Sequence, residues 1–345
     1  MHKAFLLLIC LPLLNACVLN RNFSEEHIAY LDSYKPIDKF DETSSKNSSS
    51  LKITYFGVST LLFDDGENQI LVDGFFTRPS LEKLFTFGVE LDEYHREQIE
   101  AVIDEYNMAD LLAVIAVHSH HDHAMDAPLI ADITGADLVG SDSTCKLALG
   151  LQTVQRKCYE IFNKRILRKI PLQYGNFTIK LIQTAHTKLP SIVASALGVN
   201  KPISGDFHYP ARLWDYAEGE SYSIHITHPS GSIVVHANSA LGPRELEKIE
   251  ADWLFMSVAR LASLPNSQEI FDSVAKVTSA KNIVPIHWDD FSRQTHKNLS
   301  PQKLFLGDSI EEIELLMQLN TQLDVPADTY ILDFGDHVWM TNKNK

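Results

Sequence analysis

The sequence lacks the patterns on which several common enzyme classes depend. Glycine is sparse, with 15 in 345 residues, and no glycine-rich loop of the kind that cradles phosphate groups is present. No GxSxG segment is present either, so nothing provides the turn that exposes a nucleophilic serine. P-loop enzymes and serine hydrolases of that type therefore have no support.

Cysteine is also scarce, with only 4 in the chain. Cys10 and Cys17 lie in an N-terminal apolar segment, and Cys145 and Cys158 have neither CxxC nor Cys-His spacing, so we do not assign them to a metal. In an oxidising compartment the last two can form a disulfide, whereas in a reducing one they are packing residues. The sequence leaves both states open.

Basic residues are outnumbered. The chain has 30 Lys and Arg against 45 Asp and Glu, a formal net charge of −15. Removal of an N-terminal segment that contains Lys3 leaves 29 basic residues and a net charge of 29 − 45 = −16. Such a surface repels the phosphate backbone of nucleic acids, which argues against nuclease functions and fits a secreted soluble domain.

Long apolar runs are absent beyond the N-terminus. Residues 4–14 form one, which is too short to span a bilayer as a mature helix, and we interpret residues 1–17 as a signal peptide. The sequence Leu-Asn-Ala-Cys at 14–17 resembles a bacterial lipobox, with Cys17 as the lipidated residue. Val18 then resembles the sorting pattern of outer-membrane lipoproteins facing the periplasm or cell surface. An ordinary secretory signal, cleaved nearby, is the alternative.

Residues 18–50 lack a sustained apolar period, and 43–50 form a polar low-complexity tract. We predict a flexible tether with a root-mean-square reach of roughly 30 Å. Its part at 23–34 can instead form a short helix. Residues 51–345 then make one domain large enough for a substantial core.

Within this domain, strands and helices alternate, which predicts an α/β fold. The predicted strands are 52–56, 60–64, 69–73, 111–117, 137–140, 177–184, 222–227, 232–235, 253–258 and 282–286, followed by a final hairpin across Gly335. The predicted helices are 91–106, 124–134, 141–149, 245–249, 268–278 and 310–319. A long irregular insertion at 188–220 is predicted either to be a binding loop or to use its aromatic residues only to pack against the domain.

Residues 118–123 read His-Ser-His-His-Asp-His and directly follow the apolar strand at 111–117. His118 and His120 lie two residues apart at a strand end, so their side chains project to the same side and can hold one ion. Asp122 and His123 follow the turn into the next helix and point to a neighbouring position. Two adjacent cation sites are therefore predicted, the alternative being a polar loop with a chance excess of histidine.

This cluster resembles the HxHxDH signature of the metallo-β-lactamase superfamily, and the resemblance extends over roughly residues 51–340. It implies a four-layer αβ/βα sandwich. It further implies a third histidine, His186, and a late histidine, His287, both at predicted strand ends. The bridging aspartate of the family is replaced by Asn238, and Asp73 either orients a metal ligand or caps a loop.

The resemblance implies a metal-dependent hydrolase. His118, His120 and His186 would hold one ion, while Asp122, His123 and His287 would hold a second, with Asn238 as a weak bridge. Zn²⁺ is the expected metal, as one or two ions, with Mn²⁺ and Fe²⁺ as alternatives. Zinc lowers the pKa of its bound water to about 7. If the second site is empty, Asp122 would act as the general base.

The segments at 55–60 and 286–288 resemble the ascorbate-6-phosphate lactonase-like and N-acyl-phosphatidylethanolamine phospholipase D-like branch, which has a histidine where this chain has Val58. That branch acts on lactones or phosphodiesters, so the expected partner is a small-molecule or lipid-like ester. The rival hypothesis is a non-catalytic envelope lipoprotein in which metal only stabilises the fold. His121 is expected to be structural, and His225 and His228 to face solvent.

Overall fold

The protein is described by a computed structural model covering residues 25–35, 50–151, 156–294, 298–302 and 307–341. The predicted signal peptide, Cys17 and most of the predicted tether lie outside these described residues. No helix among the described residues reaches the length and apolarity that crossing a membrane requires.

Two sheets of the described residues face each other. The first has the order β13 (His337–Thr341), β1 (Ser50–Tyr55), β2 (Leu61–Asp64), β3 (Gln69–Val72), β4 (Leu111–Ile115) and β5 (Asp137–Val139). The second has the order β12 (Asp328–Thr329), β11 (Asn282–Ile286), β10 (Trp253–Ser257), β9 (Gly231–His236), β8 (Ser221–His228), β7 (Phe177–Thr184) and β6 (Leu172–Tyr174). Each sheet is antiparallel on one side and parallel on the other.

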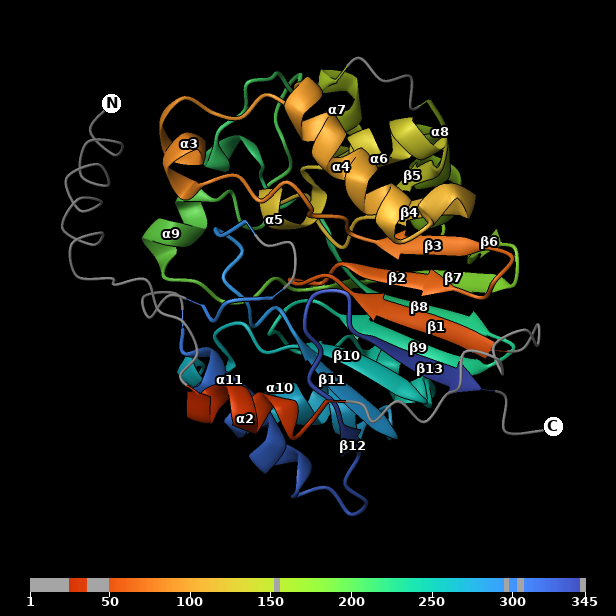
Figure 1. Cartoon of the computed structure of the whole chain (residues 1–345), viewed down its shortest axis with the longest axis vertical. Coiled ribbons are helices and arrows are strands. Elements are labelled where there is room, and N and C mark those ends of the chain that lie inside the picture. Colours follow the sequence, from red (N-terminus) through yellow and green to blue (C-terminus); the bar gives the residue numbers. More distant parts are fainter. Residues whose placement is uncertain (1–24, 36–49, 152–155, 295–297, 303–306, 342–345) are drawn as a thin grey trace.

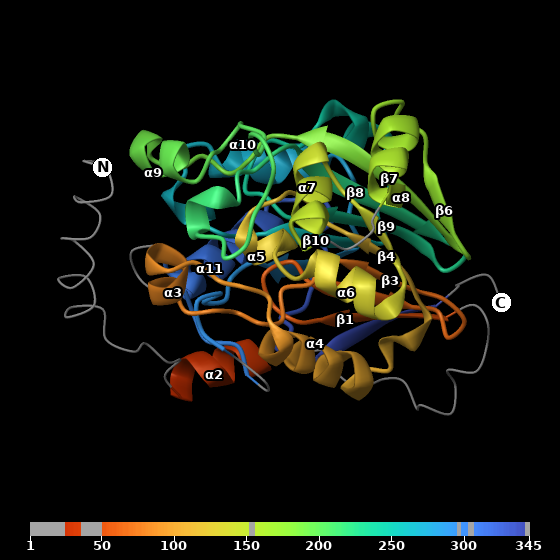
Figure 2. The same cartoon turned by 90° about the horizontal axis from the view of Figure 1, so that it is seen from above.

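Helices cover the outer face of each sheet, giving four layers (Figure 1). The first sheet carries α3 (Leu81–Thr86), α4 (Glu93–Glu105), α5 (His121–Ala124), α6 (Ala127–Thr134), α7 (Asp142–Gly150) and α8 (Arg156–Ile161). The second carries α2 (Glu25–Asp32), α10 (Ser267–Phe271) and α11 (Ser309–Asn320). A short helix, α9 (Ser191–Ala196), lies at the same end of the molecule as α3 but is separated from it in the turned view (Figure 2).

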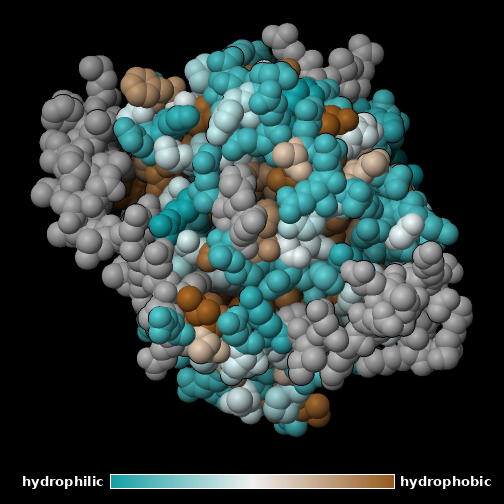
Figure 3. All heavy atoms as spheres, in the orientation of Figure 1, coloured by the Kyte–Doolittle hydropathy of each residue, from teal (hydrophilic) through white to brown (hydrophobic). Residues whose placement is uncertain are grey.

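The packing follows from strands that are apolar on both faces. All four residues of β3 and all five of β10 are buried. One apolar cluster fills the space between the sheets and extends under α11, and a second lies between the first sheet and α4, α6 and α7. On the face drawn in Figure 3, hydrophilic residues cover most of the surface and apolar residues form only small groups.

The predicted α/β sandwich is therefore observed, with two local corrections. Residues 245–249 do not form an α-helix, because Arg244–Lys248 is a 3-10 helix that begins after Pro243. The final hairpin across Gly335 is wrong. β12 pairs with β11 in the second sheet, whereas β13 crosses to the first sheet and pairs with β1.

The described part of the predicted tether is a helix attached to the domain. Leu31 of α2 is buried in the inter-sheet cluster, with Tyr30 and Tyr34 packed against it. The Tyr34 carbonyl accepts a hydrogen bond from the Ile331 amide, and Lys35 forms an ion pair with Asp336 at 3.8 Å. Residues 25–35 thus follow the helical alternative and belong to the folded unit.

Cys145 and Cys158 form a disulfide between α7 and α8, which settles the question that the sequence left open. Both residues are buried, and the bridge joins positions separated by 13 residues. A cross-link that closes a loop of this length restricts the unfolded chain, which stabilises the folded one by about 3 kcal/mol.

Replacing both cysteines with alanine should therefore lower the free energy of unfolding by about 3 kcal/mol, measured by urea denaturation under oxidising conditions. The control is the same comparison in a reducing buffer, where the parental chain loses the bridge too. A difference of the same size in both buffers would assign the loss to packing rather than to the disulfide.

Candidate metal centre

The metal centre lies where several loops meet at the ends of strands. β4 ends at Ile115, and the chain then passes through His118 and His120 into α5, which contains Asp122 and His123. β7 ends at Thr184, two residues before His186, and β11 ends at Ile286, one residue before His287. Three strand ends from two sheets therefore bring these side chains to one place, where α5 covers the strand ends (Figure 1).

The first group consists of His118, His120 and His186. Nδ1 of His120 lies 3.1 Å from Nε2 of His118 and 3.2 Å from Nε2 of His186. One ligand atom from each residue falls within 4.8 Å of the others. His118 and His120 are buried and His186 is partly buried, so the three imidazoles converge on a nearly enclosed point.

Hydrogen bonds on the far side of two rings fix their protonation. Nε2 of His120 lies 3.0 Å from the Leu197 carbonyl, and Nδ1 of His186 lies 2.8 Å from the Thr187 carbonyl. Because a carbonyl only accepts, each of these nitrogens carries the proton. In the neutral rings, Nδ1 of His120 and Nε2 of His186 are then lone-pair nitrogens that face each other.

Two lone pairs that face each other at 3.2 Å repel unless a cation lies between them. A tetrahedral site with metal–nitrogen bonds of 2.0–2.1 Å separates its ligand nitrogens by roughly 3.3 Å. Nδ1 of His118 is also buried and has no hydrogen-bond partner among the described residues. The separation, the tautomers and the donor type therefore fit a divalent ion that prefers imidazole.

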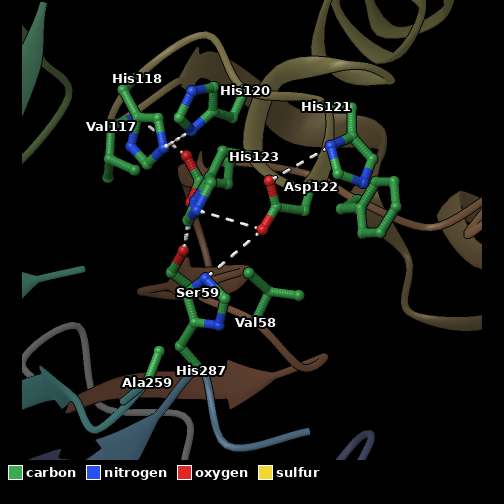
Figure 4. A network of polar contacts seen from close by, with 12 residues as sticks. Val58, Ser59, Val117, His118, His120, His121, Asp122, His123, Ala259 and His287 are labelled. Carbon is green, nitrogen blue, oxygen red and sulfur yellow. Dashed lines mark hydrogen bonds and ion pairs between the residues drawn. The ribbon is translucent and has the colours of Figure 1, made fainter. Parts of the chain in front are cut away.

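The second group consists of Asp122, His123 and His287. Oδ2 of Asp122 lies 3.7 Å from Nε2 of His123 and 3.4 Å from Nε2 of His287 (Figure 4). All three residues are buried, and their ligand atoms lie within 4.8 Å of one another. This set of two imidazoles and one carboxylate fits a second divalent ion beside the first.

Of the two roles predicted for Asp73, orienting a metal ligand or capping a loop, the structure shows the first, because Asp73 orients His123. Oδ2 of Asp73 accepts a hydrogen bond of 2.9 Å from Nδ1 of His123, and the Ser59 hydroxyl donates to the same carboxylate at 2.5 Å. Because Nδ1 makes this bond, Nε2 is the nitrogen of His123 that is turned toward Asp122. The other oxygen of Asp73 accepts the Val117 amide at 2.8 Å, which ties the carboxylate to the end of β4.

The electrostatic environment keeps two of the ligands, His118 and Asp122, in the protonation states that bind a cation. Burial, reinforced by repulsion from His123 and His120, holds the pKa of His118 well below its ordinary value. Burial would raise the pKa of Asp122, but the positive fields of His123 and His121 outweigh it and hold that pKa well below its usual range. His118 is thus neutral and Asp122 ionised at neutral pH, the states in which both bind metals.

Asn238 lies just beyond β9 and is buried. Its neighbour Ser239 donates its amide to the Thr187 hydroxyl at 2.8 Å, so Asn238 lies on the side of the centre that carries His186. Its Nδ2 has no hydrogen-bond partner among the described residues. Among the residues that the structure describes, no hydrogen bond joins Asn238 to either group of ligands, and its role as a bridge stays a prediction.

Other histidines have structural surroundings. The ring of His121 packs at 5.8 Å from both Phe75 and Phe291, as expected for a structural residue. The prediction that His228 faces solvent is wrong, because it is buried and lies 3.3 Å from Oδ2 of Asp65. Strand alternation did not predict this, because Asp65 belongs to a turn of the other sheet.

The sequence also missed the residues that hold the ligands. The Leu197 carbonyl, which fixes the tautomer of His120, comes from the 188–220 insertion. Glu218 in the same insertion is buried, and its carbonyl accepts the amide and hydroxyl of Ser119 at 2.9 and 2.8 Å. The insertion therefore supports the centre through its backbone, a role that leaves no signal in side-chain identity.

No protein-family model matches the chain. A UPF0173 metal-dependent hydrolase of Christiangramia forsetii is 32% identical over 93 residues, which cover 26% of this chain and 32% of that protein. A UPF0173 metal-dependent hydrolase of Heliobacterium modesticaldum is 24% identical over 247 residues, which cover 70% of this chain and 84% of that protein. The chain thus matches about a third of the first relative's length and most of the second's.

Among solved structures, the metallo-β-lactamase fold protein YhfI from Bacillus subtilis is similar, with a TM-score of 0.50 and 16% identity. The match covers 84% of this chain and 99% of that one. The chain therefore has the metallo-β-lactamase fold, which confirms the fold predicted from its resemblance to that superfamily. Within this fold, its sequence relatives carry the name of metal-dependent hydrolases, which favours an enzyme.

Proposed function

We propose that this protein is a metal-dependent hydrolase that uses one or two zinc ions to cleave an ester-type bond, either a lactone or a phosphodiester. The observation that carries the proposal is the pair of adjacent ligand groups, His118, His120 and His186 beside Asp122, His123 and His287. The relatives named metal-dependent hydrolases support the same class of reaction.

Zinc is proposed because the donors are five imidazoles and one carboxylate, a set that zinc accepts readily and that magnesium and calcium do not favour. Manganese and iron remain alternatives, since imidazole also suits them. A divalent ion held by these residues supplies Lewis-acid activation of a water molecule, so no protein nucleophile is needed.

The chain's own groups complete the chemistry. Asp122 is ionised at neutral pH and lies beside His123 and His287 in the second group, where it can accept the proton of the attacking water. Asp73 keeps His123 in the tautomer that turns Nε2 toward the centre. The Leu197 carbonyl binds Nε2 of His120 and so turns Nδ1 of that ring toward the centre, which sets the ligand geometry before substrate binds.

The protein is further proposed to be a bacterial envelope lipoprotein, anchored in the outer membrane through Cys17 and acting on a small-molecule or lipid-like ester. The disulfide between Cys145 and Cys158 supports export, because disulfides persist in oxidising compartments. The excess of acidic residues disfavours a nucleic-acid substrate.

The second candidate is a non-catalytic metal-binding envelope lipoprotein of the same fold. It is favoured by Asn238, which stands where the superfamily's bridging aspartate is expected. An amide contributes one neutral oxygen and no negative charge, so the second ion would be held less tightly.

The test measures the metal content of the purified protein and its hydrolysis of a generic phosphodiester, bis(4-nitrophenyl) phosphate, and of a simple lactone. We expect at least one equivalent of zinc per chain, hydrolysis of one of the two substrates, and loss of that activity on treatment with a chelator. Recovery on adding zinc back controls for damage by the chelator. Bound zinc without turnover of either substrate would favour the non-catalytic candidate.

A further inference from the structure

His287 differs from His120, His123 and His186 in how its ring is held. Its Nδ1 is buried and has no hydrogen-bond partner among the described residues, whereas His120, His123 and His186 are each oriented by a bond on the far side of the ring. The position of the His287 ring therefore depends on its backbone and on the rings of His123 and Phe291, which lie 5.2 and 6.0 Å away. That backbone has φ 62°, in the left-handed region that costs energy for a residue with a side chain.

One hydrogen bond ties this backbone to the β1–β2 turn. The His287 amide donates to the Val58 carbonyl at 2.6 Å. Val58 itself has φ 51°, which is unusual for a β-branched residue and shows that its surroundings impose the conformation. In Figure 4, Val58 lies beside His287 and Asp122, at the edge of the second group of ligands.

Val58 is in turn held by a buried ion pair. Its amide donates to Oδ1 of Asp289 at 2.7 Å, and Oδ2 of Asp289 accepts from Nη1 of Arg78 at 2.7 Å. Nη2 of Arg78 donates to the Phe56 carbonyl at 3.0 Å, on the other side of Val58. A side chain at Gly57 would lie 2.0 Å from this guanidinium, so the turn fits around Arg78.

Arg78 thus joins three loops: the β1–β2 turn, the β3–α3 loop and the segment after β11. It is among the largest fully buried side chains of the described residues, and its ion-pair partner Asp289 lies two residues after His287. Burying a charge costs free energy unless a partner of opposite charge accompanies it. The buried pair of Arg78 and Asp289 therefore fixes these loops relative to one another. We propose that Arg78 is a positioning residue that, through Asp289 and Val58, holds His287 in place as a ligand of the second metal ion.

This inference rests on the proposed function, because it presupposes the two metal ions. Its test is a titration of the chelator-treated protein with Zn²⁺ alone, followed by calorimetry, which reports the two ions separately and does not depend on activity. Breaking one half of a buried ion pair can unfold a protein, whereas replacing both halves with apolar residues is often tolerated. The main variant is therefore Arg78→Met with Asp289→Leu.

In this double variant we expect the second zinc ion to bind at least 10-fold more weakly, since loss of an outer partner of a ligand typically costs 10-fold to 100-fold in metal affinity. The first ion should bind within about threefold of the parental affinity, because two of its ligands, His120 and His186, have outer partners that the substitutions do not touch. Arg78→Lys keeps the positive charge but cannot donate to Asp289 and the Phe56 carbonyl with two separate nitrogens. We therefore expect an intermediate loss of affinity for the second zinc ion.

The matched control is His228→Leu, which breaks another fully buried pair, with Asp65, at the opposite ends of β2 and β8 from the ligands. It should weaken the fold but leave both zinc affinities unchanged. If the double variant does not fold, Arg78→Lys decides the question by the same criterion, a selective loss at the second site.

Equal weakening of both ions, or unchanged binding of the second, would overturn the positioning role while leaving the proposed function intact. A parental chain that binds one zinc ion would also overturn it, with a one-ion hydrolase still supported. A parental chain that binds no zinc would instead refute the proposed function itself.

Discussion

Replacing Asp122 with asparagine is expected to lower kcat for hydrolysis by about 100-fold to 10,000-fold, the range that a positioned general base contributes. The asparagine has the same shape but can neither accept a proton from water nor offer a charged oxygen to a cation. Because Asp122 is buried among His121, His123 and His287, removing its charge directly changes the electrostatics of the centre.

The same variant separates two roles for Asp122. Loss of kcat with the parental amount of zinc retained would assign Asp122 as the base, whereas loss together with one zinc equivalent would assign it as a ligand. Circular dichroism should show an unchanged fold in both cases. Asp132→Asn, which removes a carboxylate from the exposed face of α6, is the control and should retain parental activity. Activity within threefold of parental in Asp122→Asn would contradict both roles.

The first part of the centre could be predicted from local sequence because its ligands are neighbours. His118, His120, Asp122 and His123 lie within six residues, directly after a strand whose apolar residues are almost all buried. A strand end fixes the direction of such side chains, so the pattern alone predicted two adjacent groups. The structure places these four residues in two separate ligand groups.

The distant ligands could not be predicted in this way. His186 is 66 residues from His120 in the chain, and no periodicity connects them. Only the resemblance to a known superfamily singled out His186 and His287 among 15 histidines. The same limit explains the wrong final hairpin, because β13 pairs with β1, where Ser50 lies opposite Thr341 at the other end of the chain.

Neither the local sequence pattern nor the resemblance to the superfamily could predict the contacts that support the ligands. The Leu197 carbonyl acts on His120 through a backbone group, which is present in every residue, so its identity carries no signal. Arg78 looks like an ordinary basic residue in a loop, and its pairing with Asp289 joins positions 211 residues apart. Burial of a charge becomes visible only when the layers that enclose it are known.

Replacing Asn238 with aspartate is expected to tighten the binding of the second zinc ion by about 100-fold. A single negative charge about 4 Å from a divalent cation contributes roughly 8 kcal/mol at an effective dielectric constant of 20, and each 1.4 kcal/mol corresponds to a factor of ten. Most of this gain is offset by the cost of burying a carboxylate, because Asn238 is almost fully enclosed. The net change should be read from zinc titration calorimetry.

The variant should also make folding depend on metal. Without zinc, the introduced carboxylate would be a buried charge without a cation, so the metal-free variant should melt at a lower temperature than the metal-free parental chain. With zinc, the order should reverse, since a ligand that binds only the folded state stabilises it in proportion to its affinity. Gln322→Glu makes the same amide-to-carboxylate change on an exposed site and should alter neither quantity.

The zinc affinity and the melting temperature together decide whether the side chain of Asn238 faces the metal ions. If the side chain faces the ions, Asn238→Asp should raise both the zinc affinity and the metal-dependent gain in melting temperature. The natural asparagine then lowers the affinity of the second site. If the side chain faces away from the ions, Asn238→Asp adds only a buried charge, and the chain melts earlier both with and without zinc while its zinc affinities stay at the parental values. The second result would remove Asn238 from the centre and leave the six ligands of the two groups as the whole of it.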